Sequence, residues 1–379
     1  MQANPLRELG TLGQSLWLDY IRRDLIVSGE LRRLIHEDGV RGMTSNPSIF
    51  AEAIEGSRDY EQDIKVMSAD GKGVAAIYET LSQKDVQSAA DQFRPLYEST
   101  QARDGYVSLE VNPHLAHDTT GTIEEARRLW SALNQPNVFI KVPATAEGLP
   151  AIEQLIGEGI NVNVTLLFGI PRYRQGVEAY LAGLEARAEA GKPVASVASV
   201  ASFFVSRIDT LIDPLLEKLI SLGGKNAETA EGLHGQVAIA SAKAAYQIYK
   251  EICDSDRFRK LAHRGAQGQR LLWASTSTKN PEYSDVKYIE ALIGRDTVDT
   301  VPVESLNNYR DHGQPELRIE NEVGKAHRLL ERLPGLGISI GKMTQQLEDE
   351  GVKKFSHSFD ELMAKLGTAV SQREPASRG

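Results

Sequence analysis

The stretch from residue 138 to residue 167 reads VFIKVPATAEGLPAIEQLIGEGINVNVTLL. Apolar, partly β-branched runs at 138–142 and 161–167 predict two buried strands, and the segment between them has helical spacing. Parallel strands require a long crossover connection, which a helix supplies. The stretch therefore predicts one β–α–β unit.

Six more runs of the same kind flank this unit, at residues 15–19, 42–45, 106–111, 197–204, 270–275 and 297–301. Eight strands separated mostly by helical segments predict the α/β class, as a single (β/α)₈ TIM barrel over residues 1–370. An open doubly wound sheet is the alternative, but no Gly-rich dinucleotide turn follows the first strand. Extra helices are expected at 48–98, 255–269 and 315–366, the last pair covering the barrel or reaching across its mouth. Residues 371–379 are expected to form a disordered tail.

Composition narrows the function. The 379 residues carry a formal net charge of -9, which argues against nucleic acid or an anionic membrane as the main partner. A local cationic pocket for a phosphorylated substrate stays compatible with this charge. The single cysteine, Cys253, permits no internal disulfide and lies in a helical pattern, which favours a structural role and a cytoplasmic protein. No signal-peptide core or membrane-span length is expected.

Polar residues interrupt or end most of these apolar strands. Because the catalytic groups of barrel enzymes lie at the carboxyl ends of the strands, this distribution predicts a site. The alternative for the uncharged ones is hydrogen bonding within interior layers, whereas a buried charge is costly unless it is paired. The residues concerned are Asp19, Thr44, Asn46, Glu110, Lys141, Asn163, Thr165, Ser202 and Ser275.

Two of these residues have a clear chemical interpretation. Asn46 lies in the nonapeptide GMTSNPSIF, residues 42–50, where its amide offers a donor and an acceptor to a ligand or, alternatively, caps the following helix. Lys141 follows an apolar strand, and desolvation favours the neutral amine that attacks a ketone. A structural lysine paired with an interior carboxylate is equally compatible with the residues alone, with Asp19 or Glu110 as the partner.

Three segments together carry a specific resemblance. The nonapeptide 42–50 resembles the N-terminal signature of the transaldolase family, NVFIKVPAT at 137–145 resembles its active-site lysine strand, and EGINVNVTLLF at 158–168 resembles its fifth strand. Their order and spacing agree from about Leu16 to Val301. The resemblance implies a Schiff-base enzyme that transfers a dihydroxyacetone unit between sugar phosphates, without a metal or organic cofactor.

The resemblance also implies roles for single residues. Lys141 would form the Schiff base, Asp19 would handle the proton of the substrate's C4 hydroxyl, and Glu110 would activate a water held with Thr165. The substrate-binding residues would be Asn46, Thr44, Asn163, Ser202 and Phe204, with Arg207, Ser275 and Lys279 at the phosphate end.

The phosphate end departs from the family pattern. Phe203 and Ser206 stand where the family usually has proline and glycine, so the backbone shape there is open. Lys279 stands near where many members have an arginine, and a lysine is a less directional phosphate ligand.

Two rival functions accompany the resemblance. A fructose-6-phosphate-type aldolase would release dihydroxyacetone to water, and Phe204 bears on this choice because a phenyl ring excludes water. A non-catalytic sugar-phosphate-binding barrel would lack one of Lys141, Asp19 and Glu110. His114, His117 and Asp118 have no third histidine or metal-type spacing, so we expect a loop near the barrel mouth rather than a metal site.

Resemblance further implies that sedoheptulose 7-phosphate and glyceraldehyde 3-phosphate give erythrose 4-phosphate and fructose 6-phosphate, in the non-oxidative pentose phosphate pathway. Either a monomer or a homodimer is compatible with the sequence.

Overall fold

The computed structural model describes residues 4–55 and 58–371, and its strands form one closed barrel in which each pairs in parallel with its neighbour along the chain, β8 closing onto β1. This confirms the predicted (β/α)₈ barrel, and the open doubly wound sheet is wrong. The strands are β1 (Gln14–Asp19), β2 (Gly42–Thr44), β3 (Tyr106–Glu110), β4 (Val138–Pro143), β5 (Val162–Leu167), β6 (Ser199–Phe204), β7 (Arg270–Ala274) and β8 (Thr297–Val301).

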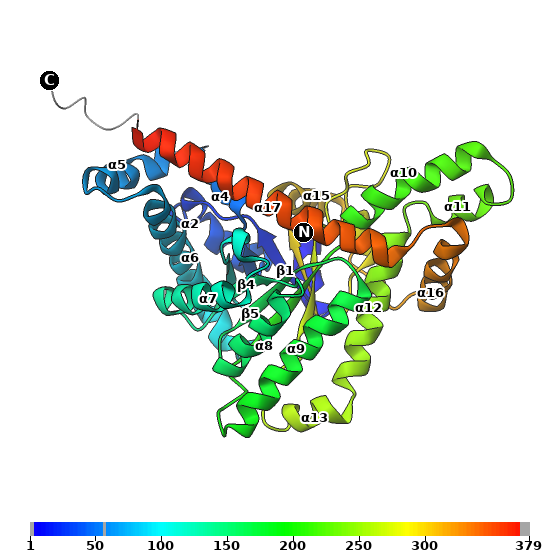
Figure 1. Ribbon diagram of the computed structural model, residues 1–379, viewed down its shortest axis with the longest axis horizontal. Helices are drawn as coiled ribbons and strands as arrows, with labels where there is room; N and C mark the ends of the chain where they lie inside the picture. Colours follow the sequence, from blue (N-terminus) through cyan, green and yellow to red (C-terminus); the bar gives the residue numbers. More distant parts are fainter. Residues whose placement is uncertain (1–3, 56–57, 372–379) are drawn as a thin grey trace.

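Helices connect the strands and surround the barrel (Figure 1). Those in the first half are α1 (Pro5–Thr11), α2 (Arg23–Val27), α3 (Glu30–Arg33), the π-helical turn η1 (Leu34–Asp38), α4 (Pro47–Glu55), the 3₁₀ turn η2 (Arg58–Tyr60), α5 (Glu61–Ala69), α6 (Val74–Ser99), the 3₁₀ turn η3 (Pro113–Leu115), α7 (Thr119–Leu133) and α8 (Gly148–Glu158).

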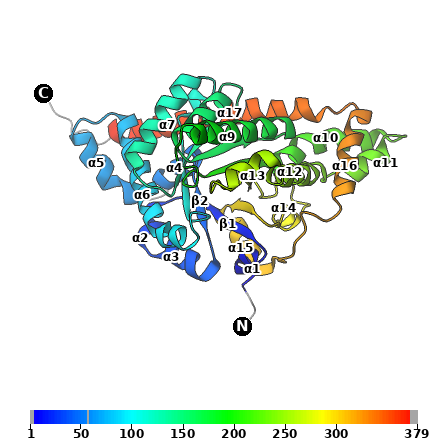
Figure 2. The same ribbon diagram turned by 90° about the horizontal axis from the view of Figure 1, so that it is seen from below.

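The second half contributes α9 (Ile170–Glu189), α10 (Ser206–Leu222), α11 (Ala227–Leu233), α12 (Val237–Cys253), α13 (Asp256–Ala262), α14 (Lys287–Ala291), α15 (Val303–His312), α16 (Val323–Arg332), the 3₁₀ turn η4 (Leu333–Leu336) and α17 (Ile340–Ser371). In Figure 2, α1 and α15 lie together near the N-terminus, where they contact each other.

The three expected helical additions are present. The insert between β2 and β3 holds α4, α5 and α6, α13 is followed by a loop, and α16 and α17 end the described chain. The expected tail begins at Ser371, which is the last residue of α17, and its remaining residues, 372–379, lie outside the described part. No helix of residues 4–55 and 58–371 is both long enough and apolar enough to cross a membrane.

The interior of the barrel is filled in layers. Trp17, Tyr106 and Phe139 form an aromatic layer, with ring centroids 4.3 Å apart for Tyr106 and Phe139 and 6.1 Å apart for Trp17 and Phe139. Gly42 makes room for it, since a Cβ atom there would lie 2.5 Å from the Trp17 ring. Such side-chain layers make a TIM barrel a packed core rather than a pore.

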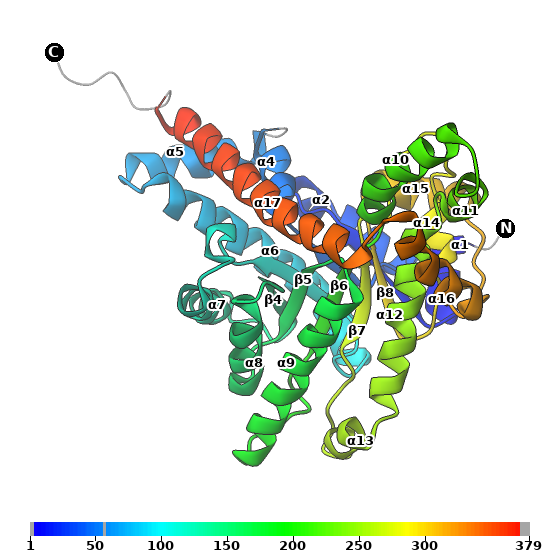
Figure 3. The same cartoon turned by 45° about the vertical axis from the view of Figure 1, so that its right-hand side comes forward.

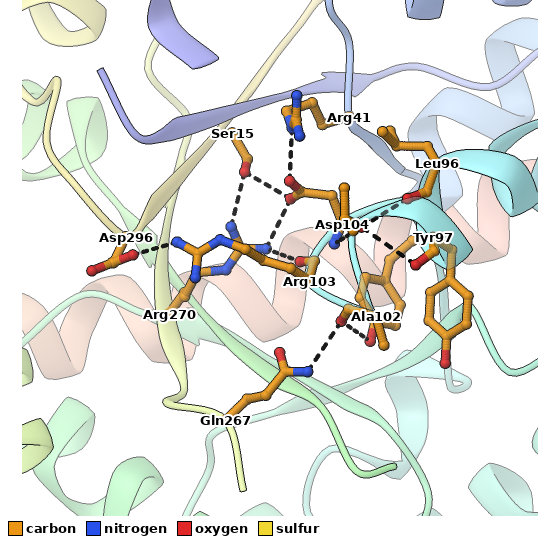
Figure 4. A network of polar contacts seen from close by, with 12 residues as sticks. Ser15, Arg41, Leu96, Tyr97, Ala102, Arg103, Asp104, Gln267, Arg270 and Asp296 are labelled. Atoms are coloured by element: carbon orange, nitrogen blue, oxygen red, sulfur yellow. Dashed lines mark hydrogen bonds and ion pairs between the residues drawn. The ribbon is translucent and has the colours of Figure 1, made fainter. Parts of the chain in front are cut away.

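A charged network lies around the first residue of β7 (Figure 4). Arg270 donates to Ser15 Oγ at 2.8 Å and to Asp104 Oδ1 at 3.0 Å, and Arg41 Nε donates to the other Asp104 oxygen at 2.7 Å. Burial opposes ionisation of Asp104, but the two guanidinium groups outweigh it and hold its pKa below the ordinary value. The network therefore pairs the charges that the core contains here.

Helix α17 lies across the opposite end of the barrel, at the carboxyl ends of the strands (Figure 3). It contacts α4 and α6 on one side and α10 on the other. Arg172 forms an ion pair with Glu348 at 2.8 Å, and the hydroxyls of Ser48 and Ser358 lie 2.9 Å apart. Close approach requires Gly351, because a Cβ atom there would lie 3.1 Å from Leu166 Cδ2. The expectation that the last helices reach across the mouth is thus confirmed for α17.

Candidate active site

A cavity of about 240 Å³ opens at the carboxyl ends of the strands, beneath α17. It is lined by residues from seven of the eight strands, from the segments after them and from α17. The predicted site residues that line it are Asp19, Thr44, Asn46, Lys141, Thr165, Ser202, Phe204, Arg207, Ser275 and Lys279, and the other lining residues are Ala274, Ser277, Thr300, Pro302 and Phe355. Glu110 and Asn163 are the two predicted residues that do not line it.

Lys141 is the only lysine of the described β-strands, and its residue is 5% exposed. Its Nζ atom donates to the backbone oxygen of Ser45 at 3.1 Å and lies 3.5 Å from Glu110 Oε2. The phenyl ring of Phe355, on α17, has its centroid 5.8 Å from Nζ. Of the two carboxylates that the sequence allowed as the partner of Lys141, Asp19 and Glu110, the structure pairs the lysine with Glu110. The amine faces the cavity.

Glu110 is buried and under-bonded. Its Oε2 is near Lys141, yet neither carboxylate oxygen has a hydrogen-bond partner among the described residues, and Thr165 Oγ1 also lacks one. Burial raises the pKa of Glu110, which the Lys141 charge opposes. In the register of the barrel, Glu110 on β3 lies beside Lys141 on β4, and Thr165 on β5 lies beside Pro143 on β4. Buried polar atoms without partners are where ordered water binds.

A second cavity, of about 210 Å³, adjoins Glu110 and Asn46 on the side of α6 and α7. Tyr78 and Phe359 are among its other lining residues. Glu110 therefore lies between this cavity and the amine of Lys141.

Asp19 ends β1 and is held by a chain of hydroxyl groups. Thr44 Oγ1 donates to Asp19 Oδ1 at 2.6 Å and lies 2.7 Å from Thr300 Oγ1. Because the single hydroxyl proton of Thr44 goes to Asp19, Thr300 must be the donor to Thr44. Burial raises the pKa of Asp19, whereas the Thr44 hydrogen bond and the Lys141 charge oppose this rise.

The two asparagines differ in position. The Asn46 side-chain oxygen accepts from Ile49 N at 3.0 Å, so it caps α4 while its amide nitrogen can still donate into the cavity. Asn163 is fully buried, donating to Ser108 Oγ at 3.2 Å and accepting from Ser202 Oγ at 2.6 Å. Asn163 thus belongs to a hydrogen-bonded interior layer beneath the cavity. This is the alternative role that the sequence left open for the uncharged polar residues of the strands.

Cationic and hydroxyl groups gather at the far end of the cavity. Arg207 lies in the first turn of α10, and Ser275 follows β7 in a left-handed conformation with φ of 56°. The Ser206 and Ser275 hydroxyls lie 3.0 Å apart. The backbone nitrogen of Ser206 also donates to the backbone carbonyl oxygen of Ser275 at 3.0 Å. Lys279 Nζ donates to Ser277 Oγ at 2.7 Å. These contacts join the ends of β6 and β7.

The departures from the family pattern leave the strand intact. Strand β6 pairs with β7 without a register shift through Phe204. Phe203 is buried between Tyr173 and Trp273, with ring centroids 6.5 Å and 6.2 Å away, and does not line the cavity. Phe204 does line it, and its ring centroid lies 5.0 Å from that of Phe168.

The two loop histidines contact different carboxylates. His114 Nε2 lies 2.7 Å from Asp360 on α17, and His117 Nδ1 lies 3.0 Å from Glu147. In the described part of the chain, no group of three or more histidine, cysteine, aspartate or glutamate side chains is arranged to hold a metal ion. Cys253 ends α12, and burial raises the pKa of its thiol to about 11, as suits an unreactive thiol.

Sequence reasoning missed Thr300, Ser277, Pro302 and Phe355. Thr300 had a usable signal, since it is a hydroxyl residue near the end of an apolar strand like the predicted ones. Phe355 had none, because the apolar pattern of a long helix does not show which side chain reaches the barrel mouth.

Comparisons with known proteins agree with this geometry. The family described as Transaldolase/Fructose-6-phosphate aldolase matches residues 16–366. A protein of Trichodesmium erythraeum named transaldolase is 47% identical, covering 99% of this chain and 100% of that protein. Proteins of the same name from Thiobacillus denitrificans and Mycolicibacterium smegmatis are 45% and 44% identical, each covering 96% of this chain and 100% and 97% of their own lengths.

The structure is a closed (β/α)₈ barrel with a buried lysine facing a cavity at the carboxyl ends of its strands. The chain belongs to the transaldolase/fructose-6-phosphate aldolase family and is an enzyme of the transaldolase type.

Proposed function

We propose that the enzyme transfers a dihydroxyacetone unit from a ketose phosphate to an aldose phosphate through a Schiff base on Lys141. The observation that carries the proposal is the buried amine of Lys141, which faces a polar cavity and lies 3.5 Å from Glu110. A carboxylate at this distance can take the proton that the ammonium must lose before attack. The iminium then serves as the electron sink, so the reaction requires no cofactor.

The first half-reaction cleaves the donor. Lys141 Nζ adds to the C2 carbonyl, and loss of water gives the imine, with Glu110 and a water at Thr165 moving the protons. Asp19 takes the proton of the C4 hydroxyl, the C3–C4 bond breaks, and its electron pair passes into the enamine that remains on Lys141. The aldose phosphate leaves with C4 as its aldehyde carbon.

The second half-reaction runs in the opposite direction. Enamine C3 attacks the aldehyde of the incoming aldose phosphate, and Asp19 returns its proton to the new hydroxyl. Water then hydrolyses the imine and releases the product ketose. The raised pKa of Asp19 suits both steps, since a more basic carboxylate accepts and returns a proton near neutral pH more readily.

Retention of the enamine distinguishes transfer from simple aldol cleavage. Two phenyl rings, Phe204 and Phe355, line the cavity together with Lys141. Apolar rings exclude the water that would protonate the enamine, which favours transfer over a fructose-6-phosphate-type aldolase. The presence of Lys141, Asp19 and Glu110 together disfavours a non-catalytic sugar-phosphate-binding barrel.

Asn46, Ser202 and Thr44 would bind the sugar hydroxyls from the cavity wall, with Asn163 fixing Ser202 from below. Arg207, Ser275 and Lys279 would bind the phosphate. We assign the reaction to the interconversion of sedoheptulose 7-phosphate and fructose 6-phosphate in the pentose phosphate pathway of the cytoplasm, by a monomer or a homodimer.

Borohydride trapping tests the proposal. Incubation with fructose 6-phosphate and reduction should leave a three-carbon adduct on the peptide that contains Lys141, detected by mass mapping. The Lys141→Arg variant is the matched control and should stay folded, unlabelled and inactive. An adduct on another lysine, or full turnover by the variant, would overturn the Schiff-base assignment.

A further inference from the structure

A third cation lies beside the phosphate end of the cavity. Lys354, on α17, directly precedes Phe355, which lines the cavity together with Arg207 and Lys279. Helix α10, which carries Arg207, contacts α17. The Arg207 guanidinium is the largest cause that lowers the pKa of Lys354, and Lys279 lowers it further, so the three positive groups share one region.

These three cations have no close carboxylate partner. Among residues 4–55 and 58–371, no carboxylate forms an ion pair with Arg207, Lys279 or Lys354 within 4.0 Å. Glu350, one turn before Lys354 on α17, acts on Arg207, and Glu304 acts on Lys279, each only as a more distant charge. A cluster of unpaired cations at a cavity mouth is stabilised when an anion with several oxygens binds between them.

We infer that Lys354 is a third ligand of the substrate phosphate, reaching it from α17 while Arg207 and Lys279 reach it from the ends of the barrel strands. The inference rests on the proposed function and deepens it, because it assigns part of the specificity for phosphorylated sugars to the C-terminal helix. A phosphate held by Lys354 also ties α17 to the barrel at the residue next to Phe355. Phosphate binding and the covering of Lys141 are thereby linked.

Inorganic phosphate is the first probe, since its binding requires no catalysis. Phosphate should raise the melting temperature of the wild-type enzyme, because a ligand that binds only the folded state stabilises it. In Lys354→Gln the dissociation constant for phosphate obtained from this shift should rise about tenfold, the effect of losing one charge-assisted contact. Lys353→Gln, which removes the same charge from the neighbouring position and is exposed like Lys354, should behave like the wild type.

Kinetics provide the second readout. With enzyme preloaded with the dihydroxyacetone unit, Lys354→Gln should lower the transfer rate to subsaturating glyceraldehyde 3-phosphate about tenfold and leave transfer to unphosphorylated glyceraldehyde unchanged. Lys354→Arg should restore most of the loss.

The outcomes separate the two proposals. Phosphate affinity that is equal in Lys354→Gln and Lys353→Gln overturns the role of Lys354, even when transfer and trapping on Lys141 succeed. Equal losses in both variants overturn it as well, since they show a general field effect. If borohydride traps no adduct on Lys141 but Lys354→Gln still weakens phosphate binding, the proposed reaction is overturned and the anion site remains.

Discussion

Asp299, on β8, provides a quantitative test of how burial acts on a carboxyl group near the site. Its residue is 0% exposed, Oδ1 accepts from Thr276 Oγ1 at 3.0 Å, and Oδ2 has no hydrogen-bond partner among the described residues. Burial raises its pKa from 3.8 to about 7, which the Thr276 hydrogen bond opposes only in part. The folded protein therefore binds a proton on Asp299 over a pH range in which the unfolded chain has lost it.

The sign and size of the effect follow from linkage. Between pH 3.8 and about pH 7 the folded state holds more protons than the unfolded state at this group, so stability falls as pH rises. Each pH unit within that range costs about 1.4 kcal/mol. From pH 5 to pH 8 the ionisation of Asp299 should thus remove about 3 kcal/mol from the free energy of unfolding.

Asp299→Asn removes the ionisable group and keeps an oxygen to accept from Thr276. Urea denaturation of wild type and variant at pH 5 and pH 8 measures the difference in unfolding free energy at each pH. We expect that difference to shift by about 3 kcal/mol in favour of the variant at the higher pH. Asp70→Asn, at an exposed position, is the control and should show no such shift.

A difference that is the same at both pH values would refute the reasoning, because it would mean that Asp299 ionises alike in the folded and unfolded chain. Turnover should stay near wild type, since Asp299 does not line the cavity and the hydrogen bond from Thr276 survives.

Three further outcomes are expected. The kcat/KM profile should lose activity on the acid side at a pH above the ordinary carboxyl range, because burial raises the pKa of Asp19 and Glu110 and both must be ionised to accept protons; a limb at pH 4 or lower would contradict this. Phe355→Ala should increase the ratio of free dihydroxyacetone to transferred product and should cost about 3 kcal/mol of stability. Phe355→Leu should have intermediate effects on both. An unchanged product ratio would show that the ring excludes no water. Asp104→Asn should cost about 3 kcal/mol at pH 7 by leaving Arg270 underpaired. This cost should shrink as the pH falls below about 4, because Asp104 is then progressively protonated in the wild type despite its lowered pKa; urea denaturation at pH 7 and at about pH 3 checks it.

The strands and their polar ends could be predicted from the sequence because each is a local pattern. A buried parallel strand is a short apolar run, so the bounds of all eight agree with the structure within two residues. Lys141 and Glu110 stood out because charges inside such runs are costly to bury. The closed barrel then brings residues from separate strands to one end without further information.

What could not be predicted depends on side-chain direction and on contacts far apart along the chain. Asn163 and Thr165 lie on the same strand, but only Thr165 lines the cavity, because Asn163 is one layer deeper. The contact of Phe355 with Lys141 depends on how α17 packs, which Gly351 permits through its close approach to Leu166. No local pattern reports such a packing arrangement.

Chemistry and enclosure therefore come from different parts of the chain. The strand ends carry the amine and the carboxylates, and hydrogen bonds within the barrel position Lys141 and Asp19 without α17. Helix α17 contributes the phenyl ring of Phe355 over Lys141 and, one residue earlier in the chain, the cation Lys354. Imine formation releases water and imine hydrolysis consumes it, whereas the enamine must be kept from water. A cover that is fixed over Lys141 would not meet both requirements. The proposed contact of Lys354 with the substrate phosphate would meet both requirements, because it would hold α17 over the amine while a phosphorylated sugar is bound.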